Sequence, residues 1–278
     1  MTSQPIGTNQ RYPERAVAGM RATLRDCMLG QAIGDALGVP YEFRARGTFE
    51  CTDMVGHGSH NQPAGTWSDD TSMALATCDS IREIRQVDIE DMRKRFLAWY
   101  HDGAYTVDGL FDIGGCTARA LDEGHGQAGP RDNGNGSLMR ILPLAFTDAS
   151  DDVIRAVSAI THAHRTSMEA CVRMVHVARE LRVGKTPEAV SELAGVPQDD
   201  IRSGGYVLDT ERAALWCLAN TTSYKDCVLA AVNLGDDTDT TAAVAGGLAG
   251  IAYGWRAIPD AWLEKLRGRD VIERCLFD

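Results

Sequence analysis

The chain has 278 residues, of which 44% are hydrophobic and 24% charged, as in an ordinary globular protein with a sizeable core. Its 28 lysines and arginines against 39 aspartates and glutamates give a net charge of -11, which disfavours binding to a nucleic-acid phosphate backbone. We expect a cytoplasmic protein, because no apolar stretch is long enough to span a membrane and the polar start lacks the apolar segment of a signal peptide.

Amphipathic stretches of helical period follow one another along the chain. Residues 1–15 are polar and carry two prolines, which predicts a mobile extension. After it, helices are expected at 17–38, 71–85, 88–101, 152–161, 166–181, 186–194, 207–219, 223–233, 239–253 and 259–268. Period-two alternation is nearly absent, apart from weak hints near 48–55. The pattern therefore predicts an all-α fold of one compact domain over 16–278, since no linker rich in Pro, Gly or Ser divides it.

The region from 102 to 140 differs from the rest. It contains DGAYTVDGLFDIGGCT and EGHGQAGPRDNGNGSLMR, which hold too much glycine for a core helix and predict a long functional loop. Near its end, Gly134, Asn135, Gly136 and Ser137 precede a short helix. Backbone N–H groups at such a start are well placed to bind a pyrophosphate, although an ordinary helix start would look the same.

Two acidic motifs stand at the starts of predicted helices. GTWSDDTSMAL, 65–75, has two adjacent aspartates between hydroxyl residues, and NLGDDTDTTAAV, 233–244, has three aspartates within four positions. Two unrelated helix caps are one interpretation, because Ser and Asp are preferred there. A cap needs only one acceptor, however, and clustered carboxylates repel one another unless a cation neutralises them. Oxygen ligands suit Mg²⁺, Mn²⁺ or Ca²⁺ rather than zinc, so the motifs predict two halves of one metal site.

Taken in order, these motifs resemble those of the ADP-ribosylglycohydrolases, the family that contains dinitrogenase reductase-activating glycohydrolase and the hydrolases that remove ADP-ribose from proteins. GQAIGDALGVPYEF is similar to the family's first helix with its terminal Glu, and GTWSDDTSMAL to its W-[ST]-D-D-T motif. FDIGGCTARAL, GNGSLMRILPLA, ITHAHRTSMEA and NLGDDTDTTAAVAGGLAGIAYG follow at the expected places. The resemblance covers nearly the whole chain and implies a helical fold with a dinuclear metal site in a cleft.

The resemblance also implies which residues hold two divalent cations, Mg²⁺ or Mn²⁺. Both acidic helix starts would contribute oxygen ligands, namely Ser68, Asp69, Asp70, Asp237, Asp239 and Thr240. Asp236 stands where the family commonly has glycine, so it is left out of the ligand set.

Three acidic residues are expected to act in catalysis: Glu42, Asp70 and Asp112. Cleaving an N-glycosidic bond requires charge stabilisation at the sugar, activation of water and protonation of the leaving group. Glu42 resembles the acidic residue that reaches the family's cleft and is the candidate acid or base, with a surface Glu beside Pro40 as the alternative. Asp112 could pair with an arginine guanidinium beside the scissile bond, or it could cap a helix.

Further residues are expected to contact the substrate through loops: Gly114, Gly115, Asn135, Gly136, Ser137 and His162. Gly114 and Gly115 match the family's segment near the distal ribose. His162 matches its Thr-His pair near the ligand, while Arg165 stands in a region where the family often has proline.

These expectations combine into a metal-dependent enzyme that removes mono-ADP-ribose from protein side chains, most of all from arginine. The expected partners are an ADP-ribosylated protein and a cognate ADP-ribosyltransferase, which an immunity protein would counteract by reversing its product or by plugging it with the N-terminal extension. A monomer is expected, without a nucleic-acid or membrane partner. The alternatives are a hydrolase of serine-linked or O-acetyl-ADP-ribose and a non-catalytic binding protein of the same fold. A terpene synthase is disfavoured, because no basic residue accompanies the first acidic motif before Arg82.

Overall fold

A computed structural model describes residues 21–278, so the predicted extension at 1–15 lies outside the described residues. The described part contains α-helices and no β-strand. In chain order the helices are α1 (Leu24–Gly38), α2 (Asp69–Ile84), α3 (Ile89–Asp102), α4 (Gly115–Glu123), α5 (Asp151–Ser158), α6 (Arg165–Arg182), α7 (Glu188–Ser191), α8 (Val207–Ala219), α9 (Tyr224–Asn233), α10 (Thr238–Tyr253), α11 (Asp260–Lys265) and α12 (Arg269–Cys275). None of them is both long and apolar enough to cross a membrane.

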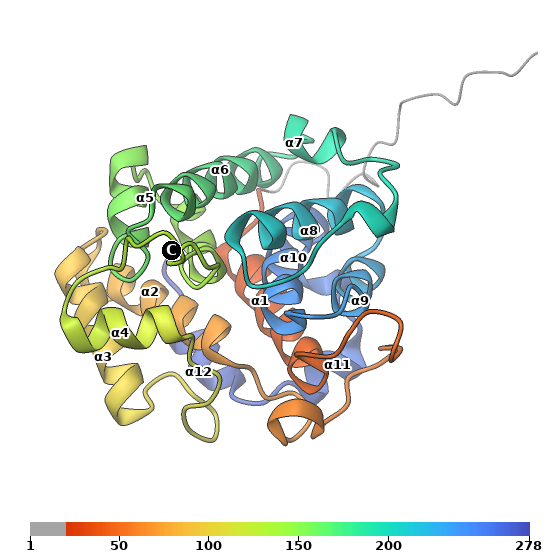
Figure 1. Cartoon of the computed structure of the whole chain (residues 1–278), viewed down its shortest axis with the longest axis horizontal. Helices are drawn as coiled ribbons and strands as arrows, with labels where there is room; N and C mark the ends of the chain where they lie inside the picture. Colours follow the sequence, from red (N-terminus) through yellow and green to blue (C-terminus); the bar gives the residue numbers. More distant parts are fainter. Residues whose placement is uncertain (1–20) are drawn as a thin grey trace, which may run out of the picture.

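Helices α1 and α10 lie side by side at the centre of the molecule and make its most extensive helix contact (Figure 1). Both helices are buried on nearly every face, which fits their largely apolar sequences with several small residues. Helices α8 and α9 pack on α10, and α2 packs on α1 (Figure 1). The first acidic motif therefore lies at the start of α2, which packs on α1, and the second lies at the start of α10.

Small residues allow α1 and α10 to approach closely. A Cβ added at Gly30 would lie 2.3 Å from the backbone oxygen of Gly246, and one at Gly38 would lie 2.3 Å from the Cα of Asp239. Real Cβ atoms do not come so close to backbone, so only glycine fits at these positions. The contact at Gly38 holds the end of α1 against the start of the second acidic motif.

Replacing Gly34 by Ala is expected to lower the free energy of unfolding by about 1–3 kcal/mol, the usual cost of overpacking, with the upper end favoured because the contact is with backbone. The added Cβ would lie 2.0 Å from the backbone oxygen of Ala242, which can move only if α10 moves. Thermal unfolding measures the effect. Gly204→Ala is the control, because no atom lies within 4 Å of a Cβ there. Equal melting temperatures for the two variants would contradict this account of the helix contact.

Most predicted helices are confirmed, but the region 102–140 was predicted wrongly as loop throughout. Helix α4 forms inside it because glycine occurs only at its two ends, where Gly114 precedes the first turn and Gly124 adopts a positive φ of 75°. Between them Thr117, Ala120 and Leu121 are buried. Helix α7 is shorter than predicted, and α12 was not predicted.

No strand forms at 48–55, where the alternation gave a weak hint. The side chain of Asn233 makes the hydrogen bonds to the Cys51 backbone that a neighbouring strand would otherwise make. Its Oδ1 accepts a hydrogen bond of 2.8 Å from the N–H of Cys51, and its Nδ2 donates one of 2.9 Å to the Cys51 carbonyl. Both backbone groups of Cys51 are thus paired by one side chain of α9, which no local pattern predicts.

Candidate active site

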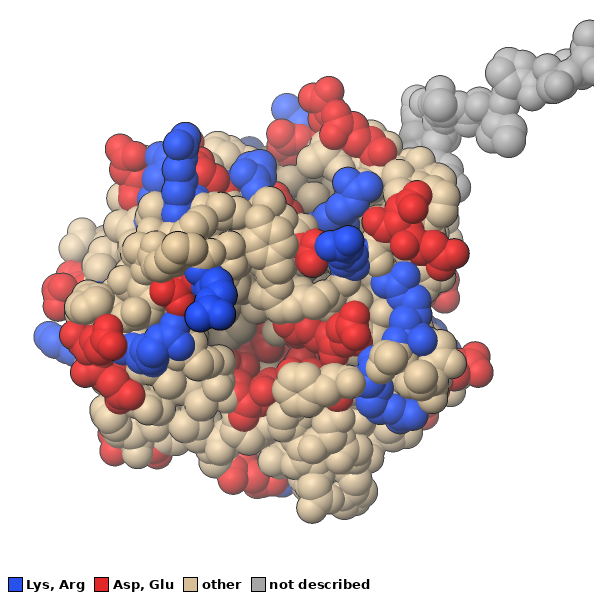
Figure 2. Space-filling model, viewed as in Figure 1, with Lys and Arg blue, Asp and Glu red and all other residues tan. Residues whose placement is uncertain are grey.

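A cleft of about 230 Å³ collects residues from segments that are far apart in the sequence. Its lining includes Glu42, Asp69, Asp112, Gly114, Gly115, Gly134, Asn135, Gly136, His162, Asp237 and Thr240. Figure 2 shows acidic side chains around a hollow near the middle of one face of the molecule. The tertiary structure thus brings most of the sequence-predicted site residues to one place.

The first acidic motif is both a helix start and part of this cleft. Ser68 is the N-cap of α2, and its Oγ accepts a 3.3 Å hydrogen bond from the N–H of Asp70 and donates one of 2.9 Å to Asp70 Oδ2. Asp35 of α1 accepts hydrogen bonds from the N–H of Ser68 (2.8 Å) and from the N–H (3.0 Å) and Oγ1 (2.6 Å) of Thr71. Helix α1 thereby holds the first turn of α2, where the helix dipole favours negative side chains.

The second acidic motif does not follow the capping interpretation. Asp237 stands at the N-cap position of α10, but its side chain makes no cap hydrogen bond. Its Oδ2 accepts a 2.8 Å hydrogen bond from Nδ2 of Asn135, which also donates to Oγ1 of Thr210 at 2.9 Å. The Oγ1 of Thr240 donates to Asp70 Oδ2 at 3.3 Å, so the two motifs meet. Asn135, predicted as a substrate contact, also holds one of the predicted metal ligands.

Three buried carboxylate oxygens have no hydrogen-bond partner within residues 21–278: Asp70 Oδ1, Asp237 Oδ1 and Asp239 Oδ2. Leaving such an atom buried and unpaired is costly. Burial, and then the charges of neighbouring carboxylates, raise the pKa of Asp70 and of Asp239 well above the ordinary value. Divalent cations, which prefer carboxylate and hydroxyl oxygens, would satisfy these atoms and remove the repulsion. The residues present therefore fit a metal centre.

Asp239 belongs to two groups of side chains that could each hold a metal ion. In one group its carboxylate lies with those of Asp35 and Asp70, and in the other with Glu42, His60 and Asp112. The ligand atoms within each group lie within 4.8 Å of one another. Both oxygens of Asp35 already accept hydrogen bonds from the start of α2, so we assign Asp35 to positioning that helix rather than to binding metal.

Glu42 follows α1 and the short 3-10 helix Val39–Tyr41 and is only 6% exposed. Burial raises the pKa of its carboxyl to about 7, the charges of Asp112 and Asp237 act in the same direction, and the hydrogen bond from His60 opposes them. That hydrogen bond joins His60 Nε2 to Glu42 Oε2 and raises the pKa of His60. Asp112 Oδ1 lies 3.8 Å from the same His60 nitrogen. Glu42 can therefore gain or lose a proton near neutral pH at the cleft.

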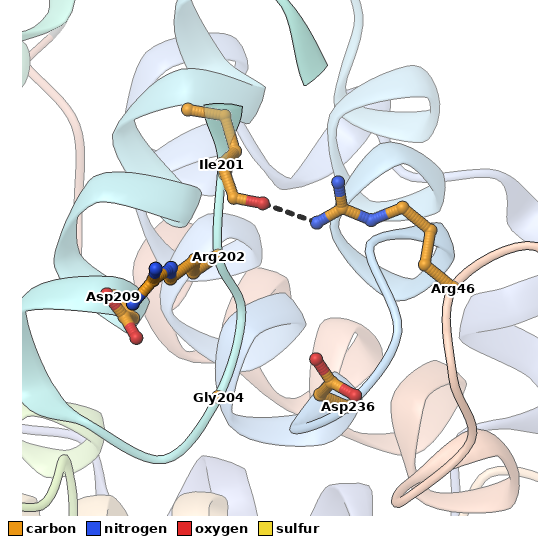
Figure 3. Close-up of a pocket in the computed structure, with 6 residues that line it drawn as sticks. All are labelled: Arg46, Ile201, Arg202, Gly204, Asp209 and Asp236. Atoms are coloured by element: carbon orange, nitrogen blue, oxygen red, sulfur yellow. Dashed lines mark hydrogen bonds between the residues drawn. The ribbon is translucent and has the colours of Figure 1, made fainter. Parts of the chain in front are cut away.

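Asp236 lies apart from the other aspartates of its motif. Its backbone has a positive φ of 59°, and so has Phe43, at 65°. The N–H of Phe43 donates to the Asp236 carbonyl at 2.7 Å, and the N–H of Asp236 donates to the Arg44 carbonyl at 2.8 Å. Figure 3 shows Asp236 on a separate hollow, whose lining is Arg46, Ile201, Arg202, Gly204, Asp209 and Asp236. The left-handed backbone favours glycine at this position, and its role is to join the Glu42 segment to the second motif.

The predicted substrate contacts differ in their placement. Gly114, Gly115, Asn135, Gly136 and His162 line the cleft. Ser137 does not, because its hydroxyl is fully buried between Ser158 Oγ, at 2.9 Å, and Cys171 Sγ, at 3.4 Å. A contact of Ser137 with the substrate would therefore have to use its backbone N–H, as expected from the sequence, and not its hydroxyl.

Comparison with known proteins identifies the family. A family model described as ADP-ribosylglycohydrolase matches residues 17–277. The chain belongs to the ADP-ribosylglycohydrolase family. It is 36% identical to a Pseudomonas putida protein named ADP-ribosylarginine hydrolase Tri1, over 96% of this chain and 80% of that protein. The Serratia proteamaculans protein of the same name is 34% identical, over 87% of this chain and 74% of that one.

Two further relatives extend the comparison. The ADP-ribosyl-[dinitrogen reductase] glycohydrolase of Rhodospirillum rubrum is 32% identical over 86% of this chain and 88% of that protein. A solved structure titled ADP-ribosylglycohydrolase-related protein complex superposes with a TM-score of 0.75 at 32% identity, covering 90% of this chain and 94% of that one. The all-helical architecture predicted from the sequence is therefore that of the family.

Sequence reasoning missed two residues of this ADP-ribosylglycohydrolase site. Asp35 could have been found from the sequence, because a carboxylate in the apolar second half of this helix is buried only where it has partners. His60 carried none, since it lies in a polar loop of glycine, serine and asparagine. Only the folded chain places it against Glu42 and Asp112.

Proposed function

We propose that the chain hydrolyses the N-glycosidic bond between ADP-ribose and protein arginine side chains, with two Mg²⁺ or Mn²⁺ ions as cofactors. The observation that carries the proposal is the set of buried, unpartnered carboxylate oxygens of Asp70, Asp237 and Asp239, which come from both acidic motifs, together with the cleft that Asp69 and Asp237 of the same motifs line. The two relatives named ADP-ribosylarginine hydrolase support the arginine linkage. Arginine-linked ADP-ribose is made by an ADP-ribosyltransferase, so the cell's counterpart to this enzyme is such a transferase, and the biological role is to reverse its product.

The metal ligands in this proposal are the oxygens of Ser68, Asp69, Asp70, Asp237, Asp239 and Thr240. When bound, divalent cations supply positive charge that binds the ribose hydroxyls and stabilises charge at the sugar. The proposal assigns Mg²⁺ or Mn²⁺ because every protein ligand is a carboxylate or hydroxyl oxygen.

The chain's own residues would carry the proton and orient the leaving group. Hydrolysis adds water to C1 of the ribose, breaks the C1–N bond and returns a proton to the departing guanidine nitrogen. Glu42 would carry this proton, because its carboxyl is buried at the cleft and the hydrogen bond from His60 orients it. Asp112, at the same end of the cleft, would pair with the guanidinium of the modified arginine.

Release of ADP-ribose from an arginine-ADP-ribosylated protein tests the proposal. We expect release with Mg²⁺ or Mn²⁺ and none after EDTA. Asp112→Asn is expected to reduce release from arginine by roughly ten- to hundredfold, because a charge-assisted hydrogen bond contributes about 1.5–3 kcal/mol. Cleavage of O-acetyl-ADP-ribose, which has no guanidinium, serves as the control for this variant.

The same assay separates the alternatives. Cleavage of serine-linked or O-acetyl-ADP-ribose without any release from arginine would still identify the chain as a hydrolase. It would contradict the role assigned to Asp112. Binding of ADP-ribose with no cleavage of any of the three substrates would instead identify a non-catalytic protein of the same fold.

A further inference from the structure

The side chain of His162 is almost wholly buried, yet one of its nitrogens is free at the cleft. The residue is 2% exposed and lines the cleft beside the glycine turn at 134–136. A Cβ at Gly136 would lie 2.7 Å from Cε1 of the ring, so the turn leaves room for this edge of the imidazole. Within residues 21–278, only Nδ1 has a hydrogen-bond partner and Nε2 has none. Because the rest of the side chain is buried while this nitrogen is without a partner in a residue that lines the cleft, Nε2 is available for a ligand.

Behind the ring, a chain of hydrogen bonds runs away from the cleft. Nη2 of Arg140 donates to Thr161 Oγ1 at 2.9 Å, and Thr161 Oγ1 lies 2.9 Å from His162 Nδ1. A guanidinium has donors only, so the Thr161 oxygen is the acceptor in the first of these bonds. No other acceptor for the Thr161 hydroxyl proton is found among the described residues. The arrangement that satisfies both groups directs this proton at an unprotonated Nδ1 and leaves the ring proton on Nε2, whereas a proton on Nδ1 would leave the Thr161 hydroxyl proton without an acceptor.

Burial and the charge of Arg140 keep the His162 ring neutral. Arg140 is fully buried, stacks over the Phe96 ring at 4.5 Å and pairs with no carboxylate of the described part of the chain. Burial, and then the charge of Arg140, lower the pKa of His162 to about 3. Asp132 opposes this shift and Arg119 supports it, but these two residues pair with each other at 2.5 Å.

We propose that Arg140 and Thr161 are positioning residues that fix His162, the substrate contact expected from the family resemblance, as a neutral imidazole with its proton on Nε2, so that it meets the ADP-ribosyl group as a hydrogen-bond donor. The assignment of the ligand rests on the proposed function, whereas the assignment of the tautomer rests on the hydrogen bonds alone. A phosphate or ribose oxygen would satisfy the donor. Because the ring does not titrate near neutral pH, this contact would not change between about pH 5 and 9.

Nitrogen-15 spectra of histidine-labelled protein test the tautomer directly. With the His162 signal assigned by its loss in His162→Gln, we expect a neutral ring protonated at Nε2 throughout this pH range. A proton on Nδ1 in the wild type, or protonation of the ring above about pH 6, would overturn the proposal. This measurement does not require enzymatic activity. It therefore tests the tautomer even if the protein releases no ADP-ribose from arginine.

Thr161→Val and Thr161→Ser form the matched pair for the ligand contact. Valine keeps the shape of threonine but cannot donate to Nδ1, whereas serine can. Calorimetric titration with ADP-ribose, in the presence of Mg²⁺, is expected to show roughly tenfold weaker binding for Thr161→Val and near wild-type binding for Thr161→Ser. In the Thr161→Val spectrum the ring should no longer be held in one tautomer. Wild-type affinity of Thr161→Val for ADP-ribose, or an unchanged His162 tautomer in this variant, would contradict the positioning role of Thr161.

Discussion

Asp239→Asn is expected to abolish hydrolysis and, in metal-free protein, to raise the melting temperature. Asp239 is fully buried, its Oδ2 has no partner in the described part of the chain, and it belongs to both groups that could hold an ion. Its loss should cost activity more than about 100-fold, since even residues that only support metal ligands cost 10- to 100-fold. Without metal, the same substitution removes a buried charge that neighbouring carboxylates repel, so the fold gains stability.

The opposite signs of these two effects separate a metal ligand from a structural residue. Activity is measured as ADP-ribose release, and stability as thermal unfolding in EDTA and again in excess Mg²⁺ or Mn²⁺. Asp236→Asn is the matched control, because Asp236 is exposed, belongs to the same motif and faces the hollow of Figure 3. We expect it to keep its activity and its stabilisation by metal. A metal-dependent rise in melting temperature that survives in Asp239→Asn would overturn the assignment of Asp239 as a ligand.

Metal-free protein is expected to lose stability as the pH rises from about 4 to 7. Burial raises the pKa of Asp35 from 3.8 to about 7, and burial likewise raises the pKa of Asp69, Asp70 and Asp239. A carboxyl with a higher pKa in the folded state binds more protons folded than unfolded, so its contribution is complete at low pH and disappears above the folded pKa. The shift at Asp35 alone corresponds to about 4 kcal/mol, or roughly 10 °C in melting temperature.

Thermal unfolding in EDTA at a series of pH values measures this loss. Added Mg²⁺ or Mn²⁺ should restore the melting temperature most strongly above pH 7, where the carboxylates are ionised and competition from protons is weakest. The pH dependence in EDTA should also be shallower in Asp239→Asn than in wild type. A melting temperature that rises with pH in EDTA would show that these carboxylates are paired rather than mutually repelled.

The helices and the two acidic motifs could be read from the sequence because their signals are local. Helix α8 begins and ends where its apolar period predicts, at Val207 and Ala219, and α2 starts beside the serine that caps it. Side chains three and four positions apart share a helix face whatever the rest of the chain does. The wrong prediction at α4 has the same origin, because the glycine content of the whole region was counted while the glycines at that helix lie at its ends.

Only the tertiary structure decided which atoms meet in the cleft. The hydrogen bond from Asn135 to Asp237 spans 102 residues of sequence, and His60 reaches Glu42 from a loop without any pattern. The neighbours Asp236 and Asp237 face different hollows, because a left-handed backbone turns one of them away from the carboxylates. The sequence alone determined the helices and the two acidic motifs whose residues we propose as ligands. Their meeting in one cleft depended on tertiary packing, including the close contact of α1 with α10 at glycines, which has no local period and exists only once the chain has folded.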